Sequence, residues 1–345
     1  MVDIEVAPAD RADGASRVRA IIEATRIAQM VYAMVELGLP DMLAGGSRAD
    51  ADLASHAGAD EPSLRRLLRG LVAAEFLKQE PDGRFGLTSS GQALRSDAPE
   101  GVRDQVRIQL HEARWRPWGN LVTSIRTGRS TMADMFGAGT WDYEAQHPDV
   151  AERFNGFMSR NSRAQQDAVL RAYDFSGFRT LVDVAGGHGQ LLGAILREYP
   201  SMHGVLFDQP AVVDGAGPVL RELGMADRCT VIGGSFFEMV PSGGDAYLLK
   251  LILHDWEDEP ARKILATVRR AISAGVRLLV VDRVLPEDRP LSVADAVSDL
   301  NMLVMLEGKE RAPSQLASLV EASGFRLERI VPTGSNVSIV ECVAI

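Results

Sequence analysis

The sequence predicts an α/β protein whose C-terminal half is a doubly wound, Rossmann-like sheet with an antiparallel last strand. Two observations lead to this prediction. From Thr180 onward, apolar segments of strand length alternate with segments of helical periodicity, the order that produces parallel βαβ units. A glycine-rich turn follows the first of these strands, at the edge where a doubly wound sheet binds its ligands.

The N-terminal part is expected to be helical, with a winged-helix pattern. Apolar residues at helical spacing run through 15–44. Residues 52–96 then predict a short helix, a turn, a second helix and two short strands around a Pro-Asp-Gly turn. Residues 100–175 are expected to form helices that are broken near Pro117 and in the glycine-rich stretch 137–139.

The C-terminal half supplies the strands of the predicted sheet. They read, in order, "TLVDVA", "HGVLFD", "CTVIGG", "AYLLKLIL", "VRLLVVDRV", "FRLERIVP" and "VSIVECVAI". Helices are expected at 190–199, 211–224, 259–273 and 292–307. The last two strands follow the final long helix directly, so we expect them to pair as an antiparallel edge.

Composition is that of an ordinary globular protein and disfavours some partners. The 345 residues carry 37 basic and 47 acidic side chains, and this net charge of −10 disfavours broad binding to nucleic acid or an anionic membrane. The acidic N-terminus lacks the apolar core of a signal peptide, and no stretch approaches the ~20 apolar residues that span a bilayer. A cytoplasmic protein is therefore expected. Cys229 and Cys342 lie in apolar segments and are expected to be reduced core thiols.

The winged-helix pattern leaves two functions open. Arg65, Arg66 and Arg69 lie on the helix that would enter a DNA groove in a winged-helix regulator. The same arginines could instead solvate the outer face of that helix, while the domain builds a dimer or a substrate lid. The acidic chain and the enzyme-like second half favour the latter interpretation, so no nucleic-acid partner is expected.

The segment "DVAGGHGQ" is the first candidate ligand site. Its glycines allow a sharp turn and a close approach of a ligand to the backbone. It matches a dinucleotide fingerprint poorly, because Leu192 stands where a third small residue belongs. Asp183 and Asp208 lie in or at the end of the first two strands, and an acid ending the second strand can accept both hydroxyls of a ribose. This spacing is similar to that of S-adenosylmethionine sites, although Asp183 could also simply bond backbone amides.

The segment "AYLLKLILHDWEDEP" is the second candidate site. It begins as a buried strand, and His254 follows where a parallel strand would meet the ligand-binding edge. It also reads as a helix start, with Asp258 as the cap and Pro260 in the first turn. A histidine that ends a strand usually does no chemistry, so the local pattern leaves both interpretations open.

Taken in order, these motifs closely resemble the small-molecule O-methyltransferases of the plant caffeate and animal acetylserotonin type, whose bacterial relatives methylate aromatic natural products. The resemblance covers nearly the whole chain and includes "ERFNGFMSRNS", "LVDVAGGHG", "LFDQP", "KLILHDWEDE" and "GKERAPSQLASLVEASGF". It implies a winged-helix dimerisation domain in 1–100, a helical linker and substrate-pocket region in 101–175 and a class I methyltransferase domain in 176–345. It also implies a homodimer.

The resemblance implies S-adenosylmethionine as the cofactor and S-adenosylhomocysteine as its product. The glycine turn would hold the methionine part, Asp208 the ribose, and Lys250 would lie beside the adenine. The full set implied for the cofactor is Asp183, Gly186, Gly187, Gly189, Asp208, Ser235, Phe236, Lys250, Met158 and Ser162. Two positions depart from the family pattern: Ala185 replaces a glycine and fits if its φ is negative, and Ser235 replaces an aspartate that receives the adenine amino group.

For catalysis, the resemblance places His254 on the general base and Asp282 and Glu310 on the two acids that bracket it. Asp282 is one methylene shorter than the plant-type glutamate. Proton transfer from a phenol of pKa ~10 to a free histidine of pKa ~6.5 is uphill by about 5 kcal/mol. Either the proton leaves as the new bond forms, or nearby carboxylates stabilise the imidazolium. The remaining histidines show no metal-ligand spacing, so no metal is expected.

The acceptor is expected to bind in an apolar pocket. The candidate lining residues are Trp141, Phe157, Met302 and Met305. For the two methionines, which share one face of helix 292–307, ordinary core filling is the alternative. The predicted function is methyl transfer from S-adenosylmethionine to a hydroxyl, phenolic by expectation, of an aromatic small molecule in bacterial natural-product biosynthesis. The alternatives are a cofactor-bound relative that does not methylate and the winged-helix DNA-binding regulator.

Overall fold

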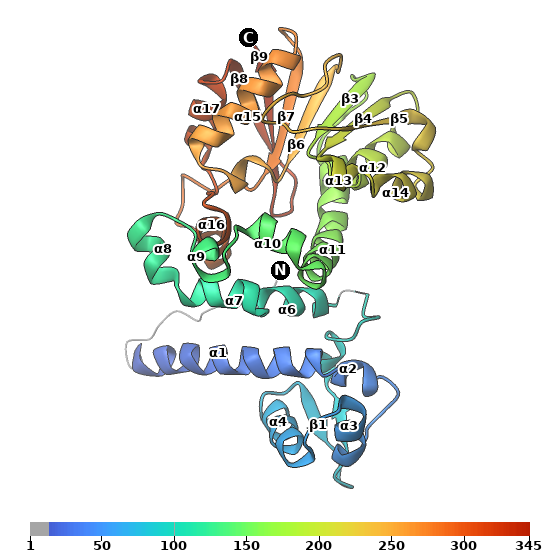
Figure 1. The fold of residues 1–345 in the computed structure, drawn as a ribbon, viewed down its shortest axis with the longest axis vertical. Coiled ribbons are helices and arrows are strands. Elements are labelled where there is room, and N and C mark those ends of the chain that lie inside the picture. The colour runs from blue at the N-terminus through green and yellow to red at the C-terminus, as the bar shows by residue number, and fades with distance from the viewer. Residues whose placement is uncertain (1–13, 100) are drawn as a thin grey trace. The chain divides into compact units, whose positions relative to one another are not determined.

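The computed structural model describes residues 14–99 and 101–345, apart from the side chains at 159–162 and 164. The chain divides into two compact units (Figure 1). The first unit comprises the residues up to Arg116 together with Pro148–Phe157. The second comprises Pro117–His147 and Met158–Ile345.

The first unit is mainly helical and contains one small hairpin. Its elements are α1 (Gly14–Glu36), α2 (Leu39–Met42), α3 (Asp50–Ala57), α4 (Glu61–Ala73), β1 (Leu77–Gln79), β2 (Phe85–Leu87), α5 (Ser89–Gln92), α6 (Arg103–Gln109) and α7 (Glu112–Gly119), the last of which continues into the second unit. The prediction of one helix over 15–44 is wrong, because Gly38 has a left-handed φ of 69° and the chain turns there between α1 and α2.

The helix, turn, helix and hairpin predicted for 52–96 are confirmed as α3, α4, β1 and β2. The side chain of Asp60 caps α4 by accepting a 3.0 Å hydrogen bond from the Ser63 amide. One apolar face of α4, with Leu64, Leu68 and Leu71, packs into a core shared with α1, α3 and the hairpin.

The second unit contains a seven-stranded sheet and the helices that cover it. The strands are β3 (Thr180–Val184), β4 (His203–Asp208), β5 (Cys229–Gly233), β6 (Ala246–Lys250), β7 (Arg277–Asp282), β8 (Phe325–Pro332) and β9 (Ser338–Ala344). The helices are α8 (Leu121–Thr127), α9 (Met132–Phe136), α10 (Thr140–Gln146), α12 (Gln190–Glu198), α13 (Pro210–Val213), α14 (Ala216–Glu222), α15 (Asp258–Ala271), α16 (Val293–Leu306), α17 (Pro313–Glu321) and most of α11 (Pro148–Ala172).

The sheet has the strand order β5-β4-β3-β6-β7-β9-β8. The first five of these strands are parallel, and β9 runs antiparallel to both β7 and β8, so the antiparallel edge predicted from the sequence is confirmed. The order reverses beside β3, because the chain goes from β3 outward to β4 and β5 and then returns to β6. Such a switch point opens a crevice at the carboxyl ends of the strands.

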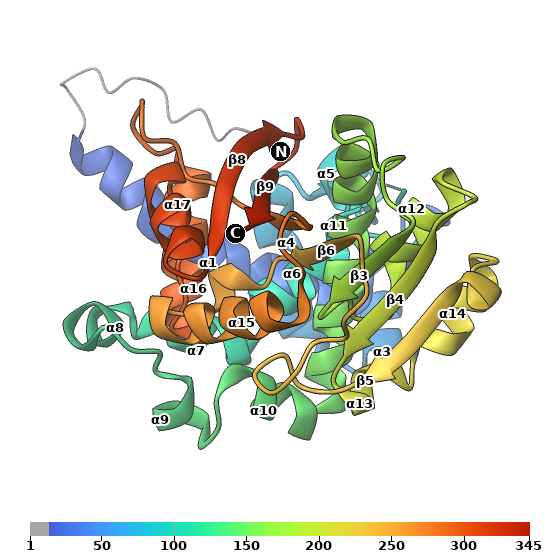
Figure 2. The ribbon, with the colours of Figure 1, turned by 90° about the horizontal axis from the view of Figure 1, so that it is seen from above.

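Helices cover both faces of the sheet, as the alternating sequence predicts (Figure 2). On one face, α15 and α17 bury apolar side chains against strand residues such as Val182, Leu249 and Val280. On the other, α12, α14 and the end of α11 pack against residues of the opposite parity, including Leu181 and Leu248. These two cores fix the positions of the strand ends.

One of the helices predicted for the second unit is divided in the structure. The helix predicted over 211–224 is two helices, α13 and α14, separated at Asp214 and Gly215. The helix break expected near Pro117 is confirmed, because α7 ends two residues after this proline and α8 begins at Leu121. Cys229 and Cys342 are free thiols, and none of the described helices is long and apolar enough to cross a membrane.

Candidate active site

The carboxyl ends of the parallel strands bring the predicted chemical groups to one edge of the sheet. The glycine turn follows β3, Asp208 ends β4, Lys250 ends β6 and Asp282 ends β7. Because β3 lies between β4 and β6, and β6 pairs with β7, these four ends are neighbours. The sheet therefore assembles the cofactor-side residues and the candidate catalytic residues at its switch point.

The chain turns sharply between β6 and His254. The predicted strand "AYLLKLIL" is too long by three residues, because Leu251 takes a left-handed φ of 55° and stops the strand at Lys250. Residues Leu253–Asp255 form a short 3₁₀ helix, anchored by the fully buried Leu253. His254 therefore projects from a turn and not from the end of a strand.

The predicted cap of α15 also differs. The N-cap residue is Glu257, without a side-chain hydrogen bond, and Asp258 is the first helical residue. The Asp258 carboxylate accepts hydrogen bonds from the guanidinium of Arg311 at 3.1 and 3.0 Å. Pro260 lies in the first turn, as expected.

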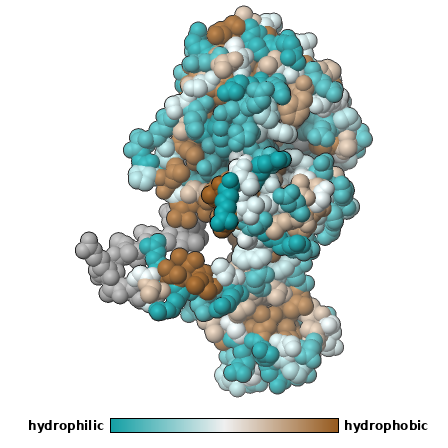
Figure 3. Space-filling model, turned by 60° about the vertical axis from the view of Figure 1, so that its left-hand side comes forward, coloured by the Kyte–Doolittle hydropathy of each residue, from teal (hydrophilic) through white to brown (hydrophobic). Residues whose placement is uncertain are grey.

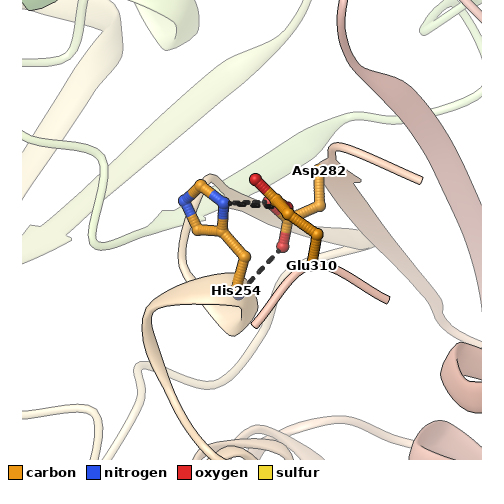
Figure 4. A group of neighbouring side chains, drawn as sticks. All are labelled: His254, Asp282 and Glu310. Carbon is orange, nitrogen blue, oxygen red and sulfur yellow. Dashed lines mark hydrogen bonds and ion pairs between the residues drawn. The ribbon is translucent and has the colours of Figure 1, made fainter. Parts of the chain in front are cut away.

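The structure brings His254, Asp282 and Glu310 together (Figure 4). His254 Nδ1 lies 3.2 Å from Glu310 Oε2 and 3.5 Å from Asp282 Oδ1. The His254 backbone amide also donates to Asp282 Oδ2 at 3.2 Å, so the shorter aspartate does reach the histidine. Both acid side chains are almost fully buried, with 3% and 1% of their surfaces exposed. Nε2 points away from both acids (Figure 4).

The electrostatics of this cluster favour a protonated histidine. Burial lowers the pKa of His254, but the negative charge of Asp282, the hydrogen bond with Glu310 and the charge of Asp255 outweigh it and raise the pKa to about 10. Burial raises the pKa of Asp282 to about 6, against the opposing charge of His254. His254 is therefore a strong base whose imidazolium form is stabilised by buried carboxylates.

Residues of α16 and of the chain after β7 hold Glu310 in place. Ser298 donates a 2.7 Å hydrogen bond to Glu310 Oε1, and Arg283 Nε lies 3.8 Å from the same oxygen. The backbone amide of Glu310 donates to Asp299 Oδ1 at 3.0 Å. These contacts fix the carboxylate that faces His254 Nδ1.

Asp255 is a further member of the cluster that the sequence motifs do not single out. Its Oδ1 lies 3.3 Å from His254 Nε2, the ring nitrogen that the other two acids leave open. Its side chain is only 13% exposed. Its place directly after His254 was the only sequence signal that could have indicated this contact.

The glycine turn after β3 has the geometry of a ligand cradle. A Cβ at Gly186 would come within 2.5 Å of the Asp183 carboxylate and 2.6 Å of Leu206, so only glycine fits there. The Gly187 amide donates a 2.8 Å hydrogen bond to Asp208 Oδ2. Gly187 and Gly189 both have left-handed φ angles, of 61° and 80°.

Ala185 does not have the negative φ that would let an alanine fit easily at this position. Its φ is 58°, in the left-handed region, and not negative. Its amide donates to the Phe207 carbonyl at 2.7 Å, which ties the turn to the end of β4. The backbone therefore demands at this position the conformation that glycine adopts freely and alanine adopts at a cost of about 1–2 kcal/mol.

Asp183 and Lys250 lie on the same face of the sheet as the glycine turn. Burial raises the pKa of Asp183 to about 7, opposed by the charge of Lys250, and burial lowers the pKa of Lys250. Among the described residues, Asp183 Oδ1 is a buried oxygen without a hydrogen-bond partner. An orphaned carboxylate oxygen beside a cradle that a Cβ would fill fits a ligand that brings hydrogen-bond donors. The site thus suits the ammonium and hydroxyl groups of S-adenosylmethionine.

The set of residues predicted to bind the cofactor also includes Ser235, Phe236, Met158 and Ser162. Ser235 Oγ accepts a 3.3 Å hydrogen bond from the Phe237 amide, and Phe236 contacts Trp256 edge-on with ring centroids 6.2 Å apart. Met158 lies half-buried on α11. Ser162 lies on the same helix, but its side chain is outside the described part of the structure. The cofactor role of these residues stays a prediction.

The residues predicted to line the acceptor pocket lie on three helices. Trp141 is on α10 and 44% exposed, Phe157 is on α11, and Met302 and Met305 are buried on α16 with 9% and 1% exposed. The Met305 backbone carbonyl accepts a hydrogen bond from Thr140, which joins α16 to α10. Substrate contact by these four residues stays a prediction.

The same cluster also has the composition of a metal site. One ligand atom from each of His254, Asp282 and Glu310 can be chosen so that all three lie within 4.8 Å of one another. No His, Asp and Glu spacing in the sequence indicates this group, because its members come together only through the sheet.

Two family models match the chain. The model described as an O-methyltransferase domain matches residues 118–326, and the model described as an O-methyltransferase dimerisation domain matches residues 20–97. Together they span both units of the structure.

Individual proteins match over nearly their full length. A phenazine O-methyltransferase of Lysobacter antibioticus is 40% identical over 315 residues, which are 91% of this chain and 92% of that protein. An 8-amino-8-demethylriboflavin N,N-dimethyltransferase of Streptomyces davaonensis is 36% identical over 321 residues, which cover 92% of each chain. Similar sequences thus include a protein named for transfer to oxygen and one named for transfer to nitrogen.

A solved structure also matches over nearly its full length. The O-methyltransferase from neocarzinostatin biosynthesis, in complex with S-adenosylmethionine and 2-hydroxy-5-methyl naphthoic acid, superimposes with a TM-score of 0.83. The two sequences are 32% identical, and the match covers 92% of this chain and 96% of that one.

Proposed function

Because this chain belongs to the O-methyltransferase family and is an S-adenosylmethionine-dependent methyltransferase, we propose that it methylates a phenolic hydroxyl of an aromatic small molecule with His254 as the general base. The observation that carries this proposal is the contact of His254 Nδ1 with Glu310 and Asp282, at 3.2 and 3.5 Å, which leaves Nε2 directed away from both acids. Asp255 Oδ1 lies 3.3 Å from Nε2 and adds a third negative charge beside the imidazole. The matched solved structure contains 2-hydroxy-5-methyl naphthoic acid, an aromatic small molecule that carries a hydroxyl group.

The proton of the acceptor sets the energetic requirement. A free histidine is too weak to take a proton from a phenol by about 5 kcal/mol. Burial lowers the pKa of His254, but its carboxylate neighbours outweigh this effect and raise the pKa to about 10. The pKa values of His254 and of a phenol are then similar, and the cost of about 5 kcal/mol for moving the proton disappears. The O–H bond of the acceptor can therefore give its proton to Nε2, while Nδ1–H donates to Glu310.

This match has a consequence for pH. A base of pKa about 10 is neutral in only about one molecule in a thousand at pH 7. The productive complex therefore holds a single proton between Nε2 and the acceptor oxygen, whichever of the two brought it. Methyl transfer should accelerate as the pH rises toward 10, because more of the complex has lost the extra proton.

The cofactor would be held by the residues at the ends of β3, β4 and β6. Asp183 and the glycine turn would receive its amino-acid part, Asp208 its ribose and Lys250 its adenine side. When bound, S-adenosylmethionine supplies an electrophilic methyl carbon on a sulfonium. The protein's part is to align the acceptor oxygen with that carbon, for which orientation can contribute up to ~7–11 kcal/mol.

The proposed assembly is a homodimer built through the matched dimerisation domain. On α1, three apolar side chains at helical spacing are exposed: Val18 at 56%, Ile21 at 59% and Ile22 at 48%. A face of this kind normally marks a contact surface. Apolar side chains are visible at the molecular surface in Figure 3. Ile21→Glu should shift the molar mass measured by light scattering from dimer to monomer.

Methyl transfer from isotopically labelled S-adenosylmethionine to a panel of phenols and aromatic amines tests the proposal. We expect the label on oxygen, and His254→Ala should reduce the rate about 10²–10⁴-fold, the usual contribution of a general base. His203→Ala, which removes an exposed histidine at the start of β4, is the matched control and should leave the rate unchanged. Label found only on nitrogen, or full activity in His254→Ala, would contradict the proposal.

A further inference from the structure

We propose that Arg311 is a positioning residue for catalysis: its guanidinium clamps the turn that carries His254 and so fixes the direction of the imidazole. The inference rests on the proposed role of His254 as general base. Arg311 reaches the His254 turn through the main-chain carbonyls of Leu253 and Trp256, and its guanidinium also binds the Asp258 carboxylate. Burial raises the pKa of Asp282, and the positive charge of Arg311 opposes this rise.

The guanidinium bridges the turn on both sides of His254. Its Nη1 donates a 2.7 Å hydrogen bond to the Leu253 carbonyl, and its Nη2 donates a 2.7 Å hydrogen bond to the Trp256 carbonyl. The residue is 2% exposed. A buried arginine whose donors go to main-chain carbonyls one residue before and two residues after His254 fixes the turn from within.

The fork of Arg311 is itself held by a carboxylate. Asp258 Oδ1 accepts from Nε at 3.1 Å and from Nη2 at 3.0 Å, which neutralises the buried charge. On the main-chain side, the Leu285 amide donates to the Arg311 carbonyl at 3.0 Å, so the segment is tied to the chain that leaves β7. Arg311 thus links the start of α15, the His254 turn and the exit of β7.

The residues just before Arg311 hold the same turn through the backbone. The Lys309 amide donates to the His254 carbonyl at 2.9 Å. Gly308 lies so close that an added Cβ would come within 2.1 Å of that carbonyl oxygen. Residues 308–311 therefore bind the carbonyls of Leu253, His254 and Trp256, while Glu310 between them meets the imidazole.

This arrangement explains why neighbouring residues carry different contacts. Glu310 faces Nδ1 of the imidazole at 3.2 Å, and Arg311 faces the main chain that bears it. The segment 308–311 therefore supplies both the carboxylate that contacts the His254 ring and the groups that hold the main chain around His254. Loss of the clamp would let the imidazole shift relative to the acceptor, and a misplacement of about 1 Å can cost about 100-fold in rate.

The test compares Arg311→Lys with Arg269→Lys. Lysine keeps the charge near Asp258 but cannot make the fork that reaches two carbonyls. Arg269 is the matched control, because its guanidinium also binds main-chain carbonyls, those of Ile272 and Gly324 at 2.9 and 3.1 Å. We expect Arg311→Lys to lower kcat about 10–100-fold with an unchanged Kd for S-adenosylhomocysteine, and Arg269→Lys to leave kcat within twofold.

Two further experiments separate the positioning role of Arg311 from the proposed role of His254 as the general base. In the His254→Ala background, Arg311→Lys should cost no further activity, because the two residues act as one unit. Asp258→Asn, on a side chain that is 40% exposed, weakens the fork without removing the arginine and should lower kcat about three- to tenfold. If Arg311→Lys does not fold, Asp258→Asn in both backgrounds decides the question.

The outcomes are distinct. Full activity of His254→Ala would overturn the proposed function, and with it this inference. A large loss in His254→Ala, together with unchanged kcat in Arg311→Lys or Asp258→Asn, would overturn the positioning role alone. Equal fold-losses for Arg311→Lys in the native and His254→Ala backgrounds would likewise show that Arg311 does not act through His254.

Discussion

Replacing Asp282 by asparagine removes one of the three carboxylate charges around His254 while it preserves the shape of the site. The amide oxygen can still accept the hydrogen bond that the His254 backbone amide donates to Oδ2 at 3.2 Å. What is lost is the negative charge 3.5 Å from Nδ1. We expect the pKa of His254 to fall from about 10 toward the ordinary histidine value.

The size of this fall follows from the distance. Two unit charges separated by 3.5 Å interact by about 5 kcal/mol at an effective dielectric constant near 20, which corresponds to about 3.5 pKa units. This is an upper bound, because the negative charge is spread over two carboxylate oxygens and the positive charge over the imidazolium ring, so that most of the charge is farther apart than 3.5 Å. Glu310, 3.2 Å from Nδ1, and Asp255, 3.3 Å from Nε2, remain in place. A fall of about 1.5–3 units is therefore expected.

An NMR titration of histidine-labelled protein measures this pKa directly. The chain has six histidines, and His254→Ala assigns the signal of interest by its disappearance. Glu341→Gln is the matched control, because Glu341 is a buried carboxylate that pairs with Arg277 and Arg329 away from His254. The reasoning is refuted if His254 titrates near 6.5 in the native protein, or if its pKa is the same in Asp282→Asn as in the native protein.

Four further outcomes are expected. The raised pKa of His254 stabilises the folded protein fully below pH 6.5, near the pKa of histidine in the unfolded chain, and this stability is lost as the pH rises through about 10. Urea unfolding should therefore show the unfolding free energy fall by about 3 kcal/mol between pH 7 and 9, and His254→Ala should abolish this fall. Ala185→Gly relieves a left-handed φ of 58° and should raise the unfolding free energy by up to ~1 kcal/mol; a destabilised variant would show that the alanine methyl packs usefully. Calorimetry should show S-adenosylhomocysteine binding weaken below pH 7, where the buried Asp183 carboxyl, with its pKa of about 7, takes up a proton, and Asp183→Asn should remove this dependence. Activity should survive EDTA; loss that zinc restores would show that the cluster around Glu310 holds a cation and not a proton.

Much of the fold could be read from the sequence, because its signals are local. Alternating apolar segments after Thr180 predict parallel strands, and the structure has these strands at the expected places along the chain. The winged-helix pattern of 52–96 depends on the periodicity of α4 and on a short turn, which the chain encodes within a few residues. The family signature itself lies in the order of such motifs.

Local signals failed where backbone conformation depends on the surroundings. Leu251 and Ala185 both adopt left-handed φ angles, of 55° and 58°, that their residue types disfavour. Leu251 therefore ends β6 earlier than its apolar sequence predicts, and Ala185 occupies a turn built for glycine. In both cases the packing of the sheet imposes a conformation that propensity alone would not choose.

The sequence by itself determined which chemical groups the chain carries to the ligand edge of the sheet, since each follows a recognisable strand or motif. Only the tertiary structure decided their contacts. His254 meets Asp282 across 28 positions of the chain and Glu310 across 56, and the clamp of Arg311 on Leu253 spans 58. Distances of a few tenths of an ångström between such partners depend on strand order, on the turn at Leu251 and on the packing of the 308–311 segment. These are properties of the folded sheet that no local pattern in the sequence encodes.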